Sequence, residues 1–484
     1  MNYKMMGRLI AQILMLEALF MVPSLLIAVM DGTKRAALAF GVSIVGVFLF
    51  AGTLYLFCRR ANRTLYTGEG MVTVSISWVL MSLFGCLPFW ISGEIPLFID
   101  AFFEIVSGFT TTGASVVANV EALSRAVLYW RSFSHWLGGM GVLVFLLAIA
   151  PSAGKSGGST LHLLRAESPG PTVSKLVPRM KQTALILYLL YIVLTLLNFL
   201  FLLIGGMPLF EAVCTAFATA GTGGFGIKAD SIAGYSPYIQ NVCTVFMLLF
   251  GVNFSCYHLI VLRQFKAVLK DEELRLYIGI VLGSIGLIVW NLRDYYATFG
   301  ETLRHAAFQV SSIITTTGFA TADFNLWPAF SKAILLCLMV IGACAGSTGG
   351  GIKCVRVLLL LKSLRRNIRL TLHPQKVEII RKDGQMVDER VVANTGMYLA
   401  AYVIIVLVSF LILSLDDYST TTHFSAVIAC FNNIGPGFDS VGPASHYGGY
   451  SALSKLVLSA DMLAGRLEIF PVLALFARST WKNA

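Results

Sequence analysis

Ten long hydrophobic runs, separated by short polar segments, dominate this chain of 484 residues. Each run is long enough, or nearly so, to cross a hydrocarbon core of roughly 30 Å as a helix. Only 13% of the residues are charged, so we predict an integral membrane protein that lies in a lipid bilayer. The runs cover residues 9–30, 36–58, 70–92, 128–150, 182–206, 239–262, 274–291, 329–345, 394–415 and 452–477.

Basic residues follow every second run, which is typical of cytoplasmic loops. Segment 353–392 holds ten Lys or Arg against four Asp or Glu, and Lys4 and Arg8 precede the first run. We therefore predict that both termini are cytoplasmic. The net charge of +11 is explained by this orientation signal and not by nucleic-acid binding. The nine cysteines form no CxxC pair, which argues against a disulfide or zinc framework.

From residue 70 onward, one pattern occurs four times: a long run, a shorter segment, a glycine-centred loop and another run. The shorter segments are predicted helices at 99–109, 209–219, 301–314 and 421–431. A single one could be an ordinary amphipathic linker. Four in register favour re-entrant pore helices, whose negative C-terminal ends would converge on a cation. The loops contain Thr111-Thr112-Gly113, Thr222-Gly223-Gly224, Thr316-Thr317-Gly318 and Asn433-Ile434-Gly435.

These patterns predict an all-α integral membrane protein. It has four membrane-pore-membrane repeats in one chain, arranged around a pseudo-fourfold pore, and two extra N-terminal transmembrane helices. The predicted divisions are 1–66 for the extra helices, then 67–180, 181–270, 271–392 and 393–484 for the repeats.

The four loops resemble those of the Trk/Ktr/HKT superfamily of potassium transporters, and the resemblance extends over essentially the whole chain. Segments 136–141, 346–351 and 465–468 add to it, and the two extra N-terminal spans are similar to those of the TrkH/TrkG branch. The resemblance implies potassium uptake across the bacterial inner membrane. It also implies a homodimer that binds a cytoplasmic nucleotide-binding ring of the TrkA or KtrA type. This chain has no nucleotide-binding fingerprint of its own.

By the same resemblance, backbone carbonyls around Gly113, Gly223, Gly318 and Gly435 form a single-layer K⁺ selectivity filter. Glycine suits this position because four backbones that meet at one axis leave little space for a Cβ. Sodium-selective relatives carry serine at the first position, so glycine there favours K⁺. The fourth loop has Asn and Ile before its glycine, which predicts a ring that is not fourfold symmetric.

The eighth run is interrupted by Gly346-Ser347-Thr348-Gly349-Gly350-Gly351. A phosphate-binding loop needs Lys directly after the last glycine, but Ile352 stands there. Such a helix break is tolerated at membrane depth only where it lines a cavity. The resemblance makes it an intramembrane gating loop below the filter. A flexible cytoplasmic hinge is the alternative.

Arg466 lies inside the last hydrophobic run, where an arginine costs at least ~2.5–3.5 kcal/mol on insertion scales. We predict that it faces the pore as part of the gate; the alternative is a buried pair with Asp461 or Glu468. Glu121, Asp230, Asp323 and Asp439 follow the four filters and form either a cation-attracting outer mouth or solvated loop charges.

No nucleophile–base cluster stands out, so the sequence gives no indication of an enzyme. An ion-coupled secondary transporter that works by alternating access is the rival prediction. Its repeats would pair into inverted halves, whereas these four have the same topology.

Overall fold

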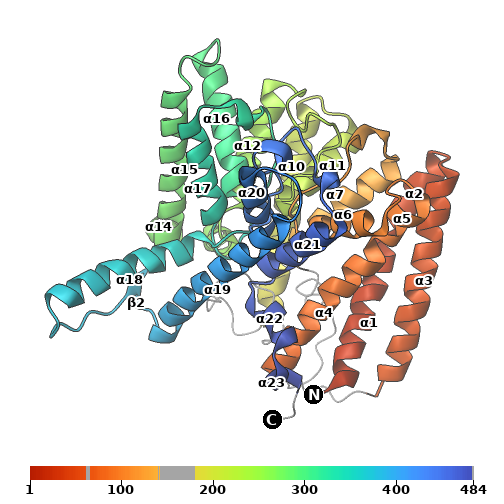
Figure 1. The fold of residues 1–484 in the computed structure, drawn as a ribbon, viewed down its shortest axis with the longest axis horizontal. Coiled ribbons are helices and arrows are strands. Elements are labelled where there is room, and N and C mark those ends of the chain that lie inside the picture. The colour runs from red at the N-terminus through yellow and green to blue at the C-terminus, as the bar shows by residue number, and fades with distance from the viewer. Residues whose placement is uncertain (61–65, 140, 142–179, 482–484) are drawn as a thin grey trace.

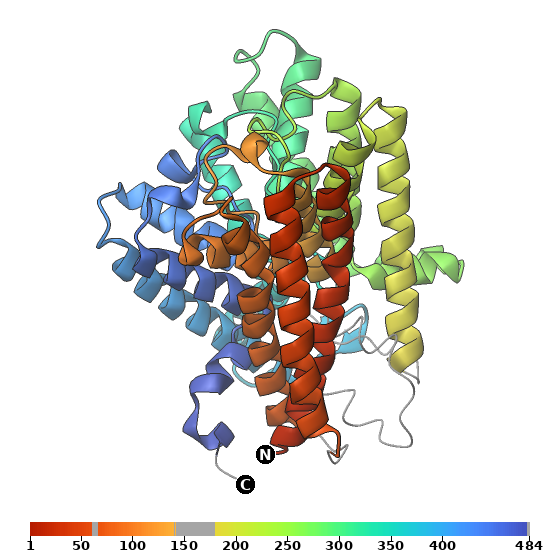
Figure 2. The same ribbon diagram turned by 90° about the vertical axis from the view of Figure 1, so that its right-hand side faces the viewer.

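The computed structural model describes residues 1–60, 66–139, 141 and 180–481. The described chain is mostly helical, and its one sheet is a hairpin of two short strands, β1 (Arg381–Lys382) and β2 (Gln385–Met386). The predicted all-α class is therefore confirmed. The start of α1 and the short C-terminal helix α23 (Arg478–Trp481) lie at the same end of the molecule (Figures 1 and 2).

The first three helices form an N-terminal hairpin that packs against the rest of the bundle (Figure 2). A break at Met21, two residues before Pro23, separates α1 from α2. Because Leu38, Val42 and Leu49 on α3 are exposed, this helix presents an apolar face suited to lipid. The hairpin comprises α1 (Tyr3–Phe20), α2 (Val22–Met30) and α3 (Lys34–Cys58).

Four helical repeats follow, each with a short helix between two longer elements (Figure 1). The short helices agree with the predicted pore helices to within two residues at each end. The first two repeats contain α4 (Thr67–Gly85), α5 (Leu87–Ser92), α6 (Phe98–Phe109) and α7 (Arg125–Gly139), then α10 (Met180–Ile204), α11 (Leu209–Gly221), α12 (Pro237–Phe250) and α13 (Phe254–Val261). The last two contain α14 (Phe265–Lys270), α15 (Glu272–Asn291), α16 (Phe299–Ile314), α17 (Ala329–Ile341) and α18 (Cys354–Leu372), then α19 (Glu389–Leu413), α20 (Thr420–Phe431), α21 (Ala452–Arg466) and α22 (Phe470–Phe476).

The first long element of each repeat is a continuous span, whereas the second is broken in repeats two, three and four. In repeat two, α12 and α13 meet at an angle of 89°. The hydrophobic run predicted at 239–262 therefore forms two helices and not one continuous span. The break at Gly251 is filled by another segment, because the N–H of Cys344 donates to the Gly251 carbonyl (3.1 Å) and that of Phe254 donates to the Gly346 carbonyl (3.0 Å).

Candidate functional site

All four short helices end in the same turn. In each, one residue has a positive φ between 54° and 59°, and the next N–H bonds to the carbonyl five residues back. This is the pattern of a Schellman motif, in which glycine is usual at the left-handed position. Here that position holds Thr or Asn, so the turns are strained. The positive-φ residues are Thr111, Thr222, Thr316 and Asn433.

A second positive φ follows two residues later, and it falls on glycine every time. In the second loop this glycine is Gly224, with a φ of 77°. Gly223 instead occupies the position of Thr112, Thr317 and Ile434. The sequence-based alignment of Gly223 with the other glycines was therefore displaced by one residue. The glycines that share this conformation are Gly113, Gly224, Gly318 and Gly435.

These four glycines pack against one another in a closed ring. A Cβ on Gly113 would collide with the Gly223 carbonyl oxygen in the second loop, and one on Gly224 with that of Thr317 in the third. A Cβ on Gly318 would collide with the Ile434 carbonyl, and one on Gly435 would lie 2.6 Å from the Thr112 carbonyl oxygen. Each loop thus contacts the next, and the fourth returns to the first. The four carbonyls come from equivalent positions of the repeats.

Hydrogen bonds between threonine hydroxyls stabilise the first and third loops. Thr110 Oγ1 lies 2.7 Å from Thr112 Oγ1, and Thr315 Oγ1 lies 2.8 Å from Thr317 Oγ1, so the first and third loops are built alike. The fourth loop differs as predicted. Asn433 Nδ2 donates to Thr112 Oγ1 (3.0 Å) and thereby ties the fourth loop to the first.

A pocket of about 150 Å³ opens on one side of the ring, which we call its upper side. Residues that follow each loop also line this pocket. All four ring glycines line it. None of the four acidic residues that follow the loops lines it, and those with a described partner bind groups in the surrounding loops or at a helix start. Asp439, for example, accepts hydrogen bonds from Ser419 and Thr422, and these bonds hold the pKa of its carboxyl below the usual range. These contacts favour the reading of the acids as loop charges.

The interruption predicted at 346–351 lies directly against the other side of the ring. The chain is non-helical from Gly342 to Lys353, and the Gly350 N–H donates to Thr316 Oγ1 (2.6 Å). Cβ atoms on Gly349 and Gly350 would collide with the carbonyls of Thr315 and Asn432, which end two of the pore helices. The segment is therefore packed beneath the third and fourth loops. This position contradicts the alternative of a flexible cytoplasmic hinge.

Arg466, at the end of α21, bridges this segment to the first repeat. Its Nη1 donates to the Thr348 carbonyl (2.9 Å), and its Nη2 donates to the carbonyls of Gly138 and Gly139. The two acids proposed as its partners have other contacts: Asp461 accepts from Ser409 Oγ (2.8 Å), and Glu468 pairs with Arg356. The guanidinium is thus placed beneath the ring, against backbone oxygens of two repeats.

Comparisons with known proteins identify the family. The family model of the TrkH cation transport protein matches residues 39–292 and 294–482. The chain belongs to the TrkH family. It is 36% identical to the Trk system potassium uptake protein TrkH of Salmonella typhimurium, over 100% of both chains. It is 34% identical to TrkG of Escherichia coli, over 97% of this chain and 96% of that protein. The crystal structure of the potassium transporter TrkH from Vibrio parahaemolyticus superimposes with a TM-score of 0.88 at 32% identity, over 100% of both chains.

Two buried charged residues beside the interrupted segment 346–351 of this TrkH-family chain, Glu273 and Lys353, were not predicted from the sequence. Glu273, at the start of α15, accepts a hydrogen bond from the Ala345 N–H (2.6 Å) and pairs with Lys382 Nζ (3.3 Å) on β1. Lys353 is buried and donates to the Gly349 carbonyl. The β1–β2 hairpin is thereby connected to the interrupted segment through one carboxylate. Glu273 was missed because it stands in a charged stretch that looks like an ordinary helix start.

The ion pair between Glu273 and Lys382 gives a testable expectation. Changing Lys382 to methionine leaves the Glu273 carboxylate buried without its cation, and breaking a buried pair costs roughly 3–5 kcal/mol. Since the Lys382 side chain retains 17% exposure, we expect a smaller loss of about 1–3 kcal/mol, seen as a lower melting temperature of the purified protein. Lys376→Met, at an exposed position nearby, is the control. Equal melting temperatures for the two variants would contradict the role of the pair.

Proposed function

We propose that this protein takes up K⁺ across the bacterial cytoplasmic membrane through a gated, channel-like pore. The closed ring of four glycine turns is the observation that carries the proposal. Its carbonyls come from equivalent positions, as a single-layer selectivity filter requires. The curated relatives are named potassium uptake proteins, which supports K⁺ as the transported ion and transport, not catalysis, as the activity.

The chemistry of the ring suits a cation that has lost its water. Backbone carbonyls can replace the hydration shell of K⁺. The C-terminal ends of α6, α11, α16 and α20 stop at the loops, and each carries partial negative charge. Gly113 occupies the first ring position, without the serine of sodium-selective relatives. In this proposal the filter comprises the ring glycines with the preceding Thr111, Thr112, Thr222, Gly223, Thr316, Thr317, Asn433 and Ile434.

Gating belongs to the segment beneath the ring. Residues 346–351 pack against the third and fourth loops, and Arg466 joins Thr348 to the end of α7. In this proposal, movement of the segment opens the path, and the guanidinium repels cations while the path is closed. Contacts through Glu273 link the segment to the β1–β2 hairpin, which makes that hairpin a route for control from the cytoplasmic side.

The projecting helix α18 is the surface that we propose for binding partner proteins. It extends beyond the bundle (Figure 1). Between its basic residues it carries exposed apolar side chains at Leu361, Leu364, Ile368 and Leu372. We propose that the protein works as a homodimer on a TrkA-type nucleotide-binding ring. The exposed apolar face of α18 supports a protein contact on this helix.

Reconstituted liposomes with an outward or inward K⁺ gradient test the function. A pore gives K⁺ flux down its own gradient, without any second ion, and single-channel currents in planar bilayers. Na⁺ in place of K⁺ is expected to give much less flux. Flux that requires a H⁺ or Na⁺ gradient, with no single-channel currents, would establish the ion-coupled transporter instead.

A further inference from the structure

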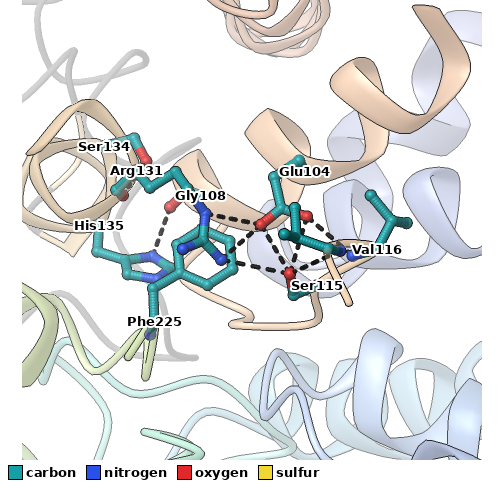
Figure 3. A network of polar contacts seen from close by, with 9 residues as sticks. Glu104, Gly108, Ser115, Val116, Arg131, Ser134, His135 and Phe225 are labelled. Atoms are coloured by element: carbon teal, nitrogen blue, oxygen red, sulfur yellow. Dashed lines mark hydrogen bonds and ion pairs between the residues drawn. The ribbon is translucent and has the colours of Figure 1, made fainter. Parts of the chain in front are cut away.

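A buried ion pair lies behind the first loop. Glu104 on α6 and Arg131 on α7 are 0% and 2% exposed. Arg131 Nε donates to Glu104 Oε1 (2.8 Å), and Nη2 lies 2.6 Å from the same oxygen. The carboxylate also accepts from Ser115 Oγ (2.9 Å) and from the Val116 N–H (2.9 Å) (Figure 3). The pair therefore fixes the chain directly after Gly113 to two helices.

The same arginine reaches the second loop. The guanidinium carbon of Arg131 lies 4.1 Å from the centre of the Phe225 ring, one residue after Gly224 (Figure 3). An arginine over an aromatic face gains a cation–π attraction that is strongest where water is excluded. Arg131 is thus held between the first loop, through Glu104 and Ser115, and the second loop, through Phe225.

One turn along α7, His135 makes a second bridge between the same loops. Its Nδ1 lies 2.8 Å from the Gly108 carbonyl in the last turn of α6, and its Nε2 accepts from the Phe225 N–H (3.2 Å). Both bonds are satisfied by the neutral ring with its proton on Nδ1. The imidazole is fully buried, so neither bond has water as a replacement.

His135 also explains why the second loop has two glycines. A Cβ on Gly223 would collide with the imidazole ring, whereas the equivalent positions hold Thr112, Thr317 and Ile434. The space that these side chains occupy elsewhere is taken in the second loop by a side chain from the first repeat. The junction between the first and second loops is therefore built differently from the other three.

We propose that Arg131 and His135 are positioning residues that set the ion selectivity of the filter. They fix the distance between the first and second loops, so that the ring does not contract around an ion smaller than K⁺. Glu104 holds Arg131 in place and balances its charge beside the cation path. This inference rests on the proposed function, because it assigns a role within the same ring.

The decisive variant is His135→Phe, which keeps a planar ring but removes both hydrogen bonds. In liposomes we expect K⁺ flux to persist and the ratio of Na⁺ flux to K⁺ flux to rise roughly fivefold or more, because the two hydrogen bonds that hold the first and second loops apart are lost. His135→Gln, which retains one donor and one acceptor, is expected to restore part of the selectivity. Arg131→Lys keeps the charge but loses the planar fork, and is expected to raise the same ratio.

Trp130→Phe is the matched control, one residue before Arg131. It removes another buried hydrogen bond of α7, from Trp130 Nε1 to the Gly85 carbonyl (3.0 Å), which joins α7 to the end of α4 and does not join two filter loops. We expect this variant to lower the melting temperature and to leave the flux ratio unchanged. If His135→Phe and Arg131→Lys lower the melting temperature without changing the ratio, or if neither folds while Trp130→Phe does, the residues are structural and the proposal is overturned. Wild-type liposomes without K⁺ flux would instead overturn the proposed function.

Discussion

Replacing Gly318 with alanine will reduce K⁺ flux more than roughly tenfold. A residue with a Cβ pays ~1–2 kcal/mol for the left-handed backbone that Gly318 adopts at a φ of 82°. The Cβ would also collide with the Ile434 carbonyl, which must then turn away from the ring. Since ~1.4 kcal/mol corresponds to a factor of ten, the two effects together account for the expected loss. Flux of K⁺ into liposomes measures it.

The control for this variant is Gly283→Ala in the same repeat. Gly283 lies within α15, and nothing stands within 4 Å of an added Cβ. Alanine is favoured over glycine inside a helix by roughly 0.5–1 kcal/mol, so this variant should be as active as the wild type and slightly more stable. Equal flux through the Gly318 and Gly283 variants would show that the ring does not carry the ion.

Replacing Arg466 with alanine will increase K⁺ flux. The change removes a positive charge beneath the ring and releases Thr348 from Gly138 and Gly139. A unit charge ~4 Å from a cation costs ~1 kcal/mol in water and ~4 kcal/mol at an effective dielectric constant of 20. An increase of roughly tenfold therefore lies within this range. The increase is measured as single-channel current in planar bilayers or as K⁺ flux into liposomes that contain equal amounts of protein.

Two further substitutions separate the causes of that increase. Arg466→Lys keeps the charge but cannot bridge three carbonyls in a planar fork, so a large increase in this variant assigns the closed state to the bridge. If the Arg466→Lys variant keeps the low flux of the wild type, the positive charge, and not the bridge, maintains the closed state. Arg365→Ala removes an exposed arginine from α18 and should change nothing. If Arg466→Ala has wild-type flux and reduced expression, Arg466 has only a structural role.

Local patterns in the sequence were sufficient for much of this architecture. The four short helices could be located because each lies between two apolar runs and stops at a polar loop. The helix break at residues 346–351 could be read from the glycines, and the family resemblance predicted its position below the filter. Long-range contacts decided the rest. The 89° bend after α12 depends on hydrogen bonds to Cys344 and Gly346, almost a hundred residues away.

The second loop shows the same limit at the scale of one residue. The letters Thr-Gly-Gly allow either glycine to be aligned with Gly113, and the sequence pattern alone favours Gly223. The backbone selects Gly224, because His135 from another repeat fills the space beside Gly223. Arg131 and Glu104 were visible as charges within apolar segments, and that exception to the pattern is the signal that could have identified them. Their pairing was not encoded in their spacing.

The linkage of all four repeats in one chain has a genetic consequence. In a pore made from four identical subunits, one codon change alters every quarter of the ring at once. Here each codon alters a single quarter, so the loops have been free to diverge: the fourth carries Asn433, and the second is braced by His135. Mutation can therefore adjust permeation in small steps, one quadrant at a time.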